Sequence, residues 1–260
     1  MKYAAFTFDD GRSDNYSLVK HIMESYRFRG TVYITTGFID GTWVEKDVLR
    51  SPSDPLTVDE IKALYDSGWE IGLHGDKHQT TVADMRSALE KLQQWGIQND
   101  SWGISIPNSH VSENEINALF ESDYGEKIAY IRRGRACDTA KLKNKVLYGL
   151  SSVLKSKWAY RRFNAENVFL YGDGSRTNIP SVVVKSTNTA EQIADFVRAL
   201  PDNTAVVLML HSILAAERPL YGKDPWSWDK ANFEKLCSAF SDMTEAHTLS
   251  VLPLMELIQR

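Results

Sequence analysis

The sequence of 260 residues lacks the features that define several large classes of protein. It has only two cysteines, Cys137 and Cys237, which are too few for a disulfide framework and lack the spacing of metal ligands. No stretch approaches the roughly 18 uninterrupted apolar residues of a membrane-spanning helix. The net charge of −4 provides no basic field that would attract nucleic acid or an anionic membrane. We therefore expect no disulfide scaffold, no membrane span and no nucleic-acid partner.

The amino-terminal stretch also lacks the pattern of a signal peptide. Residues 3–8 form only a brief apolar run before the acidic residues Asp9 and Asp10. Two isolated cysteines are typical of a protein whose thiols stay reduced. These features predict a cytoplasmic location.

Predicted strands alternate with predicted helices along the whole chain. Apolar runs rich in β-formers lie at residues 3–8, 31–36, 69–73, 101–106, 127–131, 180–184, 204–210 and 249–252. Segments with helical spacing separate most of them, which predicts an α/β fold with parallel strands. Seven or eight such units in a chain of this length favour one closed (β/α) barrel domain over residues 1–260. An open doubly wound sheet is the alternative, but no glycine-rich phosphate loop follows any strand.

Residues that can carry chemistry follow three of the predicted strands. Asp9 and Asp10 end the first strand, His74 and His78 follow the third, and His211 follows residues 204–210. The carboxyl ends of parallel barrel strands open on one face, so these side chains are expected to share one cavity. Two histidines and one carboxylate can bind one divalent metal ion and leave positions open for water and substrate. Zinc suits this set best, and cobalt, manganese, nickel or iron are alternatives.

Each of these groups also has a plain structural interpretation. An Asp-Asp-Gly sequence can simply turn the chain, and His74 and His78 can be solvated loop residues. His211 can be a buried structural histidine, although its position on the same face makes a general acid at least as good an interpretation. The coincidence of all three groups at strand ends favours a catalytic site.

Three of these segments resemble the motifs of the polysaccharide deacetylases, carbohydrate esterase family four. They are Thr-Phe-Asp-Asp-Gly at 7–11, His-x-x-x-His at 74–78 and Leu-Met-Leu-His at 208–211, in the family's order. The resemblance implies a distorted (β/α)7–8 barrel and a metal-dependent hydrolase that removes the acetyl group from an N-acetylated sugar or glycan. It further implies that Asp9 is the catalytic base and that His211 is the general acid. Asp10, His74 and His78 are then the metal ligands.

The chain departs from the family pattern around the catalytic base. The third motif is commonly Arg-x-Pro-aromatic, whereas residues 105–108 read Ser-Ile-Pro-Asn. The arginine that would orient Asp9 is therefore missing, and Arg132 or Arg133 is expected to replace it. Pro107, Arg132 and Arg133 are the predicted substrate-binding residues.

Other departures leave the substrate open. The fourth motif has no clear match, and Asp138 and Asp173 are candidates for its aspartate by position only. The cluster Arg132, Arg133 and Arg135 can meet an anionic group such as a phosphate, or it can be solvated surface.

The predicted partner is an N-acetylated sugar or glycan precursor, either free, nucleotide-linked or lipid-linked. Tyr221, Trp226 and Trp228 can stack on sugar rings or pack loops. Two further hypotheses are a catalytically impaired carbohydrate-binding pseudo-enzyme and a hydrolase of a formyl amide or cyclic imide. Nothing in the sequence indicates the oligomeric state.

Overall fold

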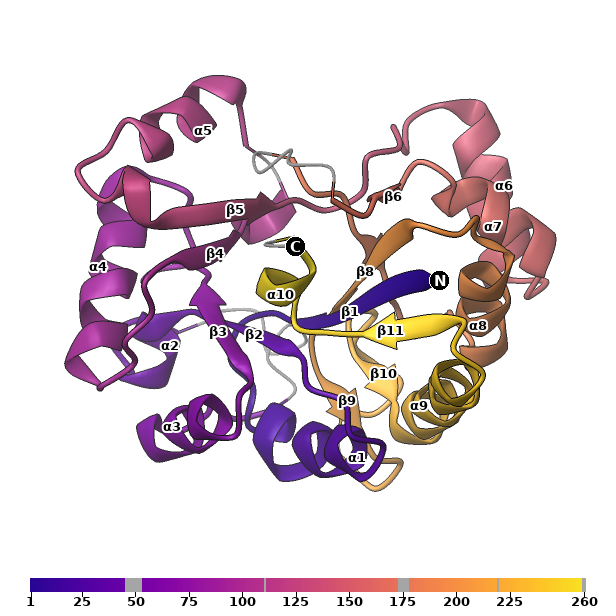
Figure 1. Cartoon of the computed structure of the whole chain (residues 1–260), viewed down its shortest axis with the longest axis horizontal. Coiled ribbons are helices and arrows are strands. Elements are labelled where there is room, and N and C mark those ends of the chain that lie inside the picture. The colour runs from indigo at the N-terminus through magenta and orange to yellow at the C-terminus, as the bar shows by residue number, and fades with distance from the viewer. Residues whose placement is uncertain (45–52, 110, 173–177, 219, 259–260) are drawn as a thin grey trace.

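The computed structural model describes residues 1–44, 53–109, 111–172, 178–218 and 220–258. A ring of parallel strands occupies the centre, with helices outside it (Figure 1). The hydrogen-bonded order is β5-β4-β3-β2-β1-β8, and β7 pairs with the far side of β8. These strands are β1 (Lys2–Phe8), β2 (Thr31–Ile34), β3 (Glu70–Leu73), β4 (Trp102–Ser105), β5 (Ile128–Arg132), β7 (Val182–Val183) and β8 (Thr204–Leu210).

The sheet closes on itself between β5 and β7. Arg132, the last residue of β5, forms a parallel bridge with Ile179, which lies just before β7. The Ile179 N–H donates to the Ile131 carbonyl at 3.0 Å, and the Arg133 N–H donates to the Ile179 carbonyl at 2.9 Å. Closure confirms the predicted barrel and excludes the open doubly wound sheet.

The barrel is distorted because several short strands pair with only part of a neighbouring strand. The strand β11 (Leu249–Val251) pairs with the amino half of β1, while β2 pairs with only the last two residues of β1. On the other side, β6 (Val168–Leu170) runs antiparallel along the amino half of β8. The prediction that all strands are parallel is therefore wrong for β6. A separate pair, β9 (Ile213–Leu214) and β10 (Trp228–Asp229), follows β8. The strands β6, β9 and β10 were not predicted from the sequence.

The helices other than the last one form the outer layer, and several begin at a capping side chain. Thr57 and Ser112 each form a capping box at the start of α3 and α5, and Thr81 caps α4. The first helix starts with a π-helical segment, Asn15–Lys20, and ends earlier than expected because Arg27 has a left-handed φ of 60°. The helices are α1 (His21–Ser25), α2 (Thr36–Ile39), α3 (Val58–Asp66), α4 (Val82–Gln94), α5 (Glu113–Phe120), α6 (Leu142–Ser152), α7 (Lys157–Asn164), α8 (Ala190–Ala199), α9 (Lys230–Glu245) and α10 (Leu254–Ile258). Within the described ranges, no helix is long and apolar enough to cross a membrane.

Alternate residues of each strand face the helices or the barrel interior. In β1, Phe6 and Phe8 join the large core between strands and helices, whereas Ala5 joins a separate cluster inside the ring. Helix α10 lies in the middle of the ring in Figure 1, and its Leu254 and Leu257 belong to that inner cluster. The last helix therefore fills the amino end of the barrel.

A column of buried polar groups runs through the barrel from α10 toward the carboxyl ends of the strands. The Glu70 carboxylate accepts hydrogen bonds from the Met255 N–H at 2.8 Å and the Tyr130 hydroxyl at 2.5 Å. The hydroxyls of Tyr130 and Tyr33 lie 2.6 Å apart, and the guanidinium of Arg132 lies 5.1 Å from the ring centroid of Tyr33. The column leads to the end of the barrel where the candidate site lies.

Candidate active site

The end of β1 separates two adjacent carboxylates. The Asp9 N–H makes the last hydrogen bond to β8, donating to the Leu210 carbonyl at 3.0 Å. Asp10 and Gly11 then adopt left-handed conformations, with φ of 78° and 79°. Few residues other than glycine tolerate this conformation, and aspartate is among those enriched in it. The turn places Asp9 and Asp10 in different surroundings, as expected.

Asp9 is held by an arginine from the opposite part of the sheet. One Arg132 nitrogen, Nη2, donates to both Asp9 oxygens at 2.5 and 2.6 Å, and each of the two residues is only 1% exposed. Burial is the largest single influence and would raise the pKa of Asp9, but Arg132, together with His74 and His211, outweighs it, and the pKa lies below its ordinary value. Asp9 is therefore ionised at neutral pH.

The position of Arg132 accounts for the missing arginine of the third motif. Ser105 stands where that motif has its arginine, and Ser105 and Arg132 are direct register partners across β4 and β5. Arg132 also donates to the Ser105 hydroxyl, which in turn lies 3.3 Å from an Asp9 oxygen. An arginine thus reaches the base from the neighbouring strand at the same level of the barrel.

Asp10, His74 and His78 form a cluster that fits a divalent metal ion. Asp10 Oδ1 lies 3.4 Å from His74 Nε2 and 3.6 Å from His78 Nε2. Two ligands bound at about 2.1 Å in a tetrahedral shell are separated by roughly 3.4 Å, so these spacings suit one ion. His74 Nδ1 lies 2.9 Å from the Ser105 carbonyl oxygen, which can only accept. Nδ1 therefore carries the proton and Nε2 presents its lone pair to the cluster.

Arg12 holds the other oxygen of Asp10. Its Nη2 donates to Asp10 Oδ2 at 2.9 Å, which leaves Oδ1 facing the two histidines. Burial opposes ionisation of Asp10, yet Arg12 and the hydrogen bond to His74 hold its pKa well below the ordinary value. Arg12 follows the turn directly, in place of the proline usual in the family, and was not predicted to take part in the site.

The loop that carries the two histidines is organised by Asp84, in the first turn of α4. The Asp84 carboxylate accepts the backbone N–H groups of Asp76, Lys77 and Gln79 at 2.9–3.0 Å. Gly75 has a φ of 80°, and a Cβ there would collide with that carboxylate. Sequence reasoning missed Asp84, although an acid three residues after the helix cap Thr81 was visible.

His211 lies at the end of β8 and lines the same cavity as Asp9 and Asp10. Burial lowers its pKa below the ordinary value, and this effect outweighs attraction by the two aspartates. Its Nδ1 is buried with no hydrogen-bond partner among the described residues. The backbone around it is fixed, because Asn15 Nδ2 donates to the His211 carbonyl at 3.3 Å.

The candidate groups surround a cavity of about 280 Å³. The ring of Trp43 lies 5.6 Å from that of His78, and the ring of Trp226 lies 5.3 Å from that of His211. The lining residues are Asp9, Asp10, Arg12, Trp43, His74, His78, Ile106, Asn108, Ser109, Met209, His211 and Trp226. Cavity walls with aromatic faces and ionised groups suit a sugar carrying a polar substituent.

Several predicted residues lie elsewhere. Pro107 and Arg133 are not among the described residues that line the cavity. Pro107 is buried, and Arg133 Nη2 donates to the Val111 carbonyl at 3.0 Å. The Asp138 carboxylate accepts the backbone N–H of Ala140. Asp173 lies outside the described residues. Trp228 is buried and donates to the Asn188 carbonyl.

Tyr221, the last of the predicted aromatic residues, donates to Asp229 at 2.5 Å. Trp226 is therefore the only one of the three aromatics among the described residues lining the cavity.

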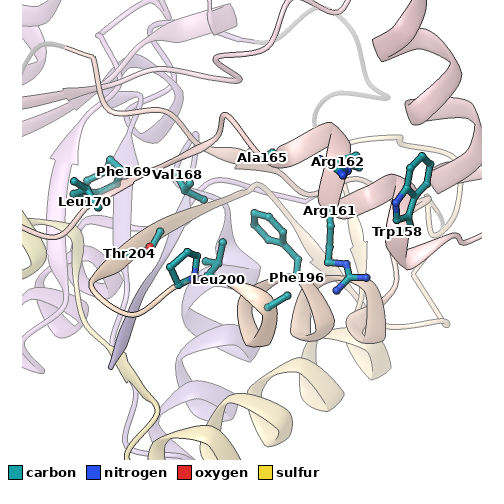
Figure 2. A pocket seen from close by; sticks show the side chains of 12 residues that line it. Trp158, Arg161, Arg162, Ala165, Val168, Phe169, Leu170, Phe196, Leu200 and Thr204 are labelled. Atoms are coloured by element: carbon teal, nitrogen blue, oxygen red, sulfur yellow. The ribbon is translucent and has the colours of Figure 1, made fainter.

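A larger groove of about 590 Å³ lies on the outer surface between α7, β6 and α8 (Figure 2). Its walls are mainly apolar, with Phe169, Phe196 and Leu200 among them, and Arg161 and Arg162 extend from α7 beside it. None of the described residues that line it is a histidine or a carboxylate. The groups that can perform acid–base chemistry are in the smaller cavity.

Comparison with known proteins bears out the resemblance. Residues 1–121 match the family model of polysaccharide deacetylases. The fold is similar to that of a family 4 acetyl xylan esterase from Clostridium thermocellum solved with a cobalt ion, at 14% identity, a TM-score of 0.52, and coverage of 99% of this chain and 90% of that one.

It is also similar to a mutant of a family 4 pseudoenzyme with restored enzymatic activity, at 10% identity, a TM-score of 0.51, and coverage of 98% and 67%. No curated protein matches. At these identities the structural likenesses establish the fold, a distorted (β/α) barrel of the family 4 type.

Proposed function

Because residues 1–121 carry the polysaccharide deacetylase signature, we propose that this protein is a metal-dependent hydrolase that removes the acetyl group from an N-acetylated sugar or glycan precursor. The observation that carries the proposal is the meeting of an ionised base, a metal-binding cluster and a histidine in one cavity. The base is Asp9, the metal-binding cluster is Asp10, His74 and His78, and the histidine is His211.

The donor set suits one divalent cation, and zinc is the proposed ion. When bound, such an ion lowers the pKa of the water it holds and polarises the carbonyl of the acyl group. Arg12 and the Ser105 carbonyl orient two of the ligands, Asp10 and His74, before any ion binds. A cluster oriented in advance loses little freedom on binding the ion.

Asp9 is placed to accept the proton of the attacking water. It is ionised in the folded protein, and Arg132 fixes both of its oxygens. His211 is proposed to protonate the departing nitrogen. Its lowered pKa leaves it neutral in the free site, so it takes up a proton from solvent when negative charge develops on the substrate beside it and passes that proton to the nitrogen.

Arg132 weakens the hypothesis of an impaired carbohydrate-binding pseudo-enzyme. That hypothesis rests on the degraded third and fourth motifs. For the third motif, β5 supplies an arginine to the same carboxylate. A formyl amide or cyclic imide as the substrate remains a separate hypothesis, which substrate comparison resolves. A cytoplasmic location also remains a prediction.

The direct test is release of acetate by protein loaded with zinc, cobalt or manganese. N-acetylhexosamines are offered free, as nucleotide conjugates and as oligomers, beside formylated sugars and cyclic imides. We expect acetate release from an N-acetylated sugar and its loss in Asp9→Asn. Absence of acetate release with every metal, from protein whose circular dichroism shows an intact fold, would contradict the proposal.

A further inference from the structure

A second, basic pocket lies beside the catalytic cavity. It has a volume of about 260 Å³ and is formed by the chain after β5, the start of α6, α7 and the chain after β7. Arg135, Lys145 and Lys185 provide three positive charges, and Tyr148 and Phe163 form apolar walls. We refer to these five residues as the basic pocket.

Among its described lining residues, the basic pocket has no acidic side chain to balance its positive charges. Burial, followed by repulsion from Arg135, lowers the pKa of Lys185, and burial lowers the pKa of Arg135. Residues 139–165 around it contain lysines and arginines but no aspartate or glutamate, although the whole chain has a net charge of −4. A bound anion would relieve this concentration of positive charge.

Arg135 is held in place by contacts that leave donors unused. Its guanidinium lies 5.1 Å from the ring centroid of Phe163 and 6.0 Å from that of Tyr148. One terminal nitrogen donates to the Val183 carbonyl at 3.3 Å, while the buried Nε has no partner among the described residues. A guanidinium fixed in this way has the planar shape that pairs with the oxygens of a phosphate.

The basic pocket and the catalytic cavity share a wall. Lys185 Nζ lies 4.2 Å from the ring centroid of Trp226, and the Trp226 ring lies 5.3 Å from that of His211. Trp226 lines the catalytic cavity and Lys185 lines the basic pocket. The two pockets are therefore adjacent.

We propose that the basic pocket binds the phosphate of a phosphorylated N-acetyl sugar whose acetamido group occupies the catalytic cavity. The inference rests on the proposed function for the acetamido end and on the basic pocket for the phosphate end. A sugar 1-phosphate and a nucleoside diphosphate sugar share this chemistry, and the experiment separates them.

Binding is measured by calorimetry with metal-loaded Asp9→Asn protein, which keeps the ligand intact. The ligands are N-acetylglucosamine, its 1-phosphate and its uridine diphosphate conjugate. We expect the phosphorylated sugars to bind at least about tenfold more tightly than the neutral sugar, because charged hydrogen bonds are strong. A further gain for the uridine diphosphate conjugate would identify the nucleotide-linked source, and equal affinity for the two would identify the 1-phosphate.

The variants Lys185→Gln and Lys145→Gln are expected to reduce this preference. Lys143→Gln is the matched control, because Lys143 is an exposed lysine of α6 that does not line the basic pocket. The control should keep the full preference. Equal affinity for phosphorylated and neutral sugars, or a preference that survives in both pocket variants, overturns the inference.

Pyrophosphate, which contains no sugar, separates the two proposals. Pyrophosphate binding that weakens in Lys185→Gln supports the basic pocket even when no acetate is released from any sugar. Acetate release from neutral sugars with no pyrophosphate binding supports the deacetylase and overturns the basic pocket.

Discussion

The two halves of the chain contribute differently to the candidate site. Residues 1–121 match the family model and provide the base and the candidate metal ligands in short local motifs. The second half, which lies outside that match, provides Arg132, His211 and the basic pocket. The base and the candidate metal ligands therefore lie in short local motifs, whereas Arg132 joins them only through its position in the barrel.

Removing the metal ligands tests the first half and has the largest expected effect. In His74→Ala and His78→Ala the cluster loses one of its three donors, so bound divalent metal and acetate release should both fall to background. Metal content by mass spectrometry of purified protein is the measurement. His21→Ala, an exposed histidine of α1, is the control and should keep both. Retention of stoichiometric metal in both ligand variants would show that the ion binds elsewhere.

Exchanging Ser105 and Arg132 tests whether Arg132 performs the role of the third-motif arginine from the neighbouring strand. Arg132→Ser leaves the buried Asp9 carboxylate without its partner, and we expect activity to fall by about 10²–10⁴-fold and stability by about 3–5 kcal/mol. The double variant Ser105→Arg with Arg132→Ser returns the arginine to the third-motif position across the β4–β5 register. We expect it to recover part of the activity and stability of the single variant, measured by acetate release and urea unfolding. A double variant no better than the single one would show that Arg132 does more than support Asp9.

The pH profile reports the same pair. In the wild type the pKa of Asp9 lies below its ordinary value of 3.8, so the base stays ionised as pH falls into the acidic range. Without Arg132 burial is the leading influence and raises that pKa, so the acidic limb of kcat/KM should move to higher pH. An unchanged acidic limb in Arg132→Ser would mean that Asp9 does not control it.

Gly75→Ala tests how the first half positions its histidines. A Cβ at Gly75 collides with Asp84, which holds the loop, so we expect metal affinity to fall by roughly 10–100-fold. Gly172 has the same φ of 80° with open space around it, so Gly172→Ala measures the backbone strain alone. Similar metal titrations for the two variants would rule out the collision as the cause.

The smallest effect is expected at Glu70, a half-buried acid at the start of β3, the end of that strand opposite His74. Burial raises its pKa above the ordinary 4.5 despite its hydrogen bonds from Tyr130 and Met255, so the folded state keeps this proton to higher pH than the unfolded state. The free energy of unfolding should therefore decrease as pH rises from about 4.5 through the folded pKa, by about 1.4 kcal/mol per unit of difference. Denaturant unfolding of Glu70→Gln between pH 4 and 7 should lack this component.

Much of the fold could be predicted because long apolar strands and capped helices are local signals. Residues 204–210 and the capping box at Thr57 needed no tertiary information. The strands β6, β9 and β10 were missed because two or three residues show no periodicity, and their partners alone make them strands.

The same distinction applies to the site. The predicted cluster of Asp10 with two histidines followed from strand ends, and the structure brings these residues together. The choice between Arg132 and Arg133 could not be made from sequence, because it depends on which residue of β5 faces the barrel interior. Asp84 was missed because it accepts backbone N–H groups of the preceding loop, and the conformation of that loop is visible only in the structure.

The position of β1 also has a kinetic consequence. This first strand pairs with β8 and β11, which come from the opposite end of the chain, and α10 completes the interior beside it. The first strand is therefore synthesised long before β8 and β11, the two strands that flank most of it. Contacts at such sequence separation slow folding, so we expect the end of β1 that carries Asp9 and Asp10 to become ordered late in folding.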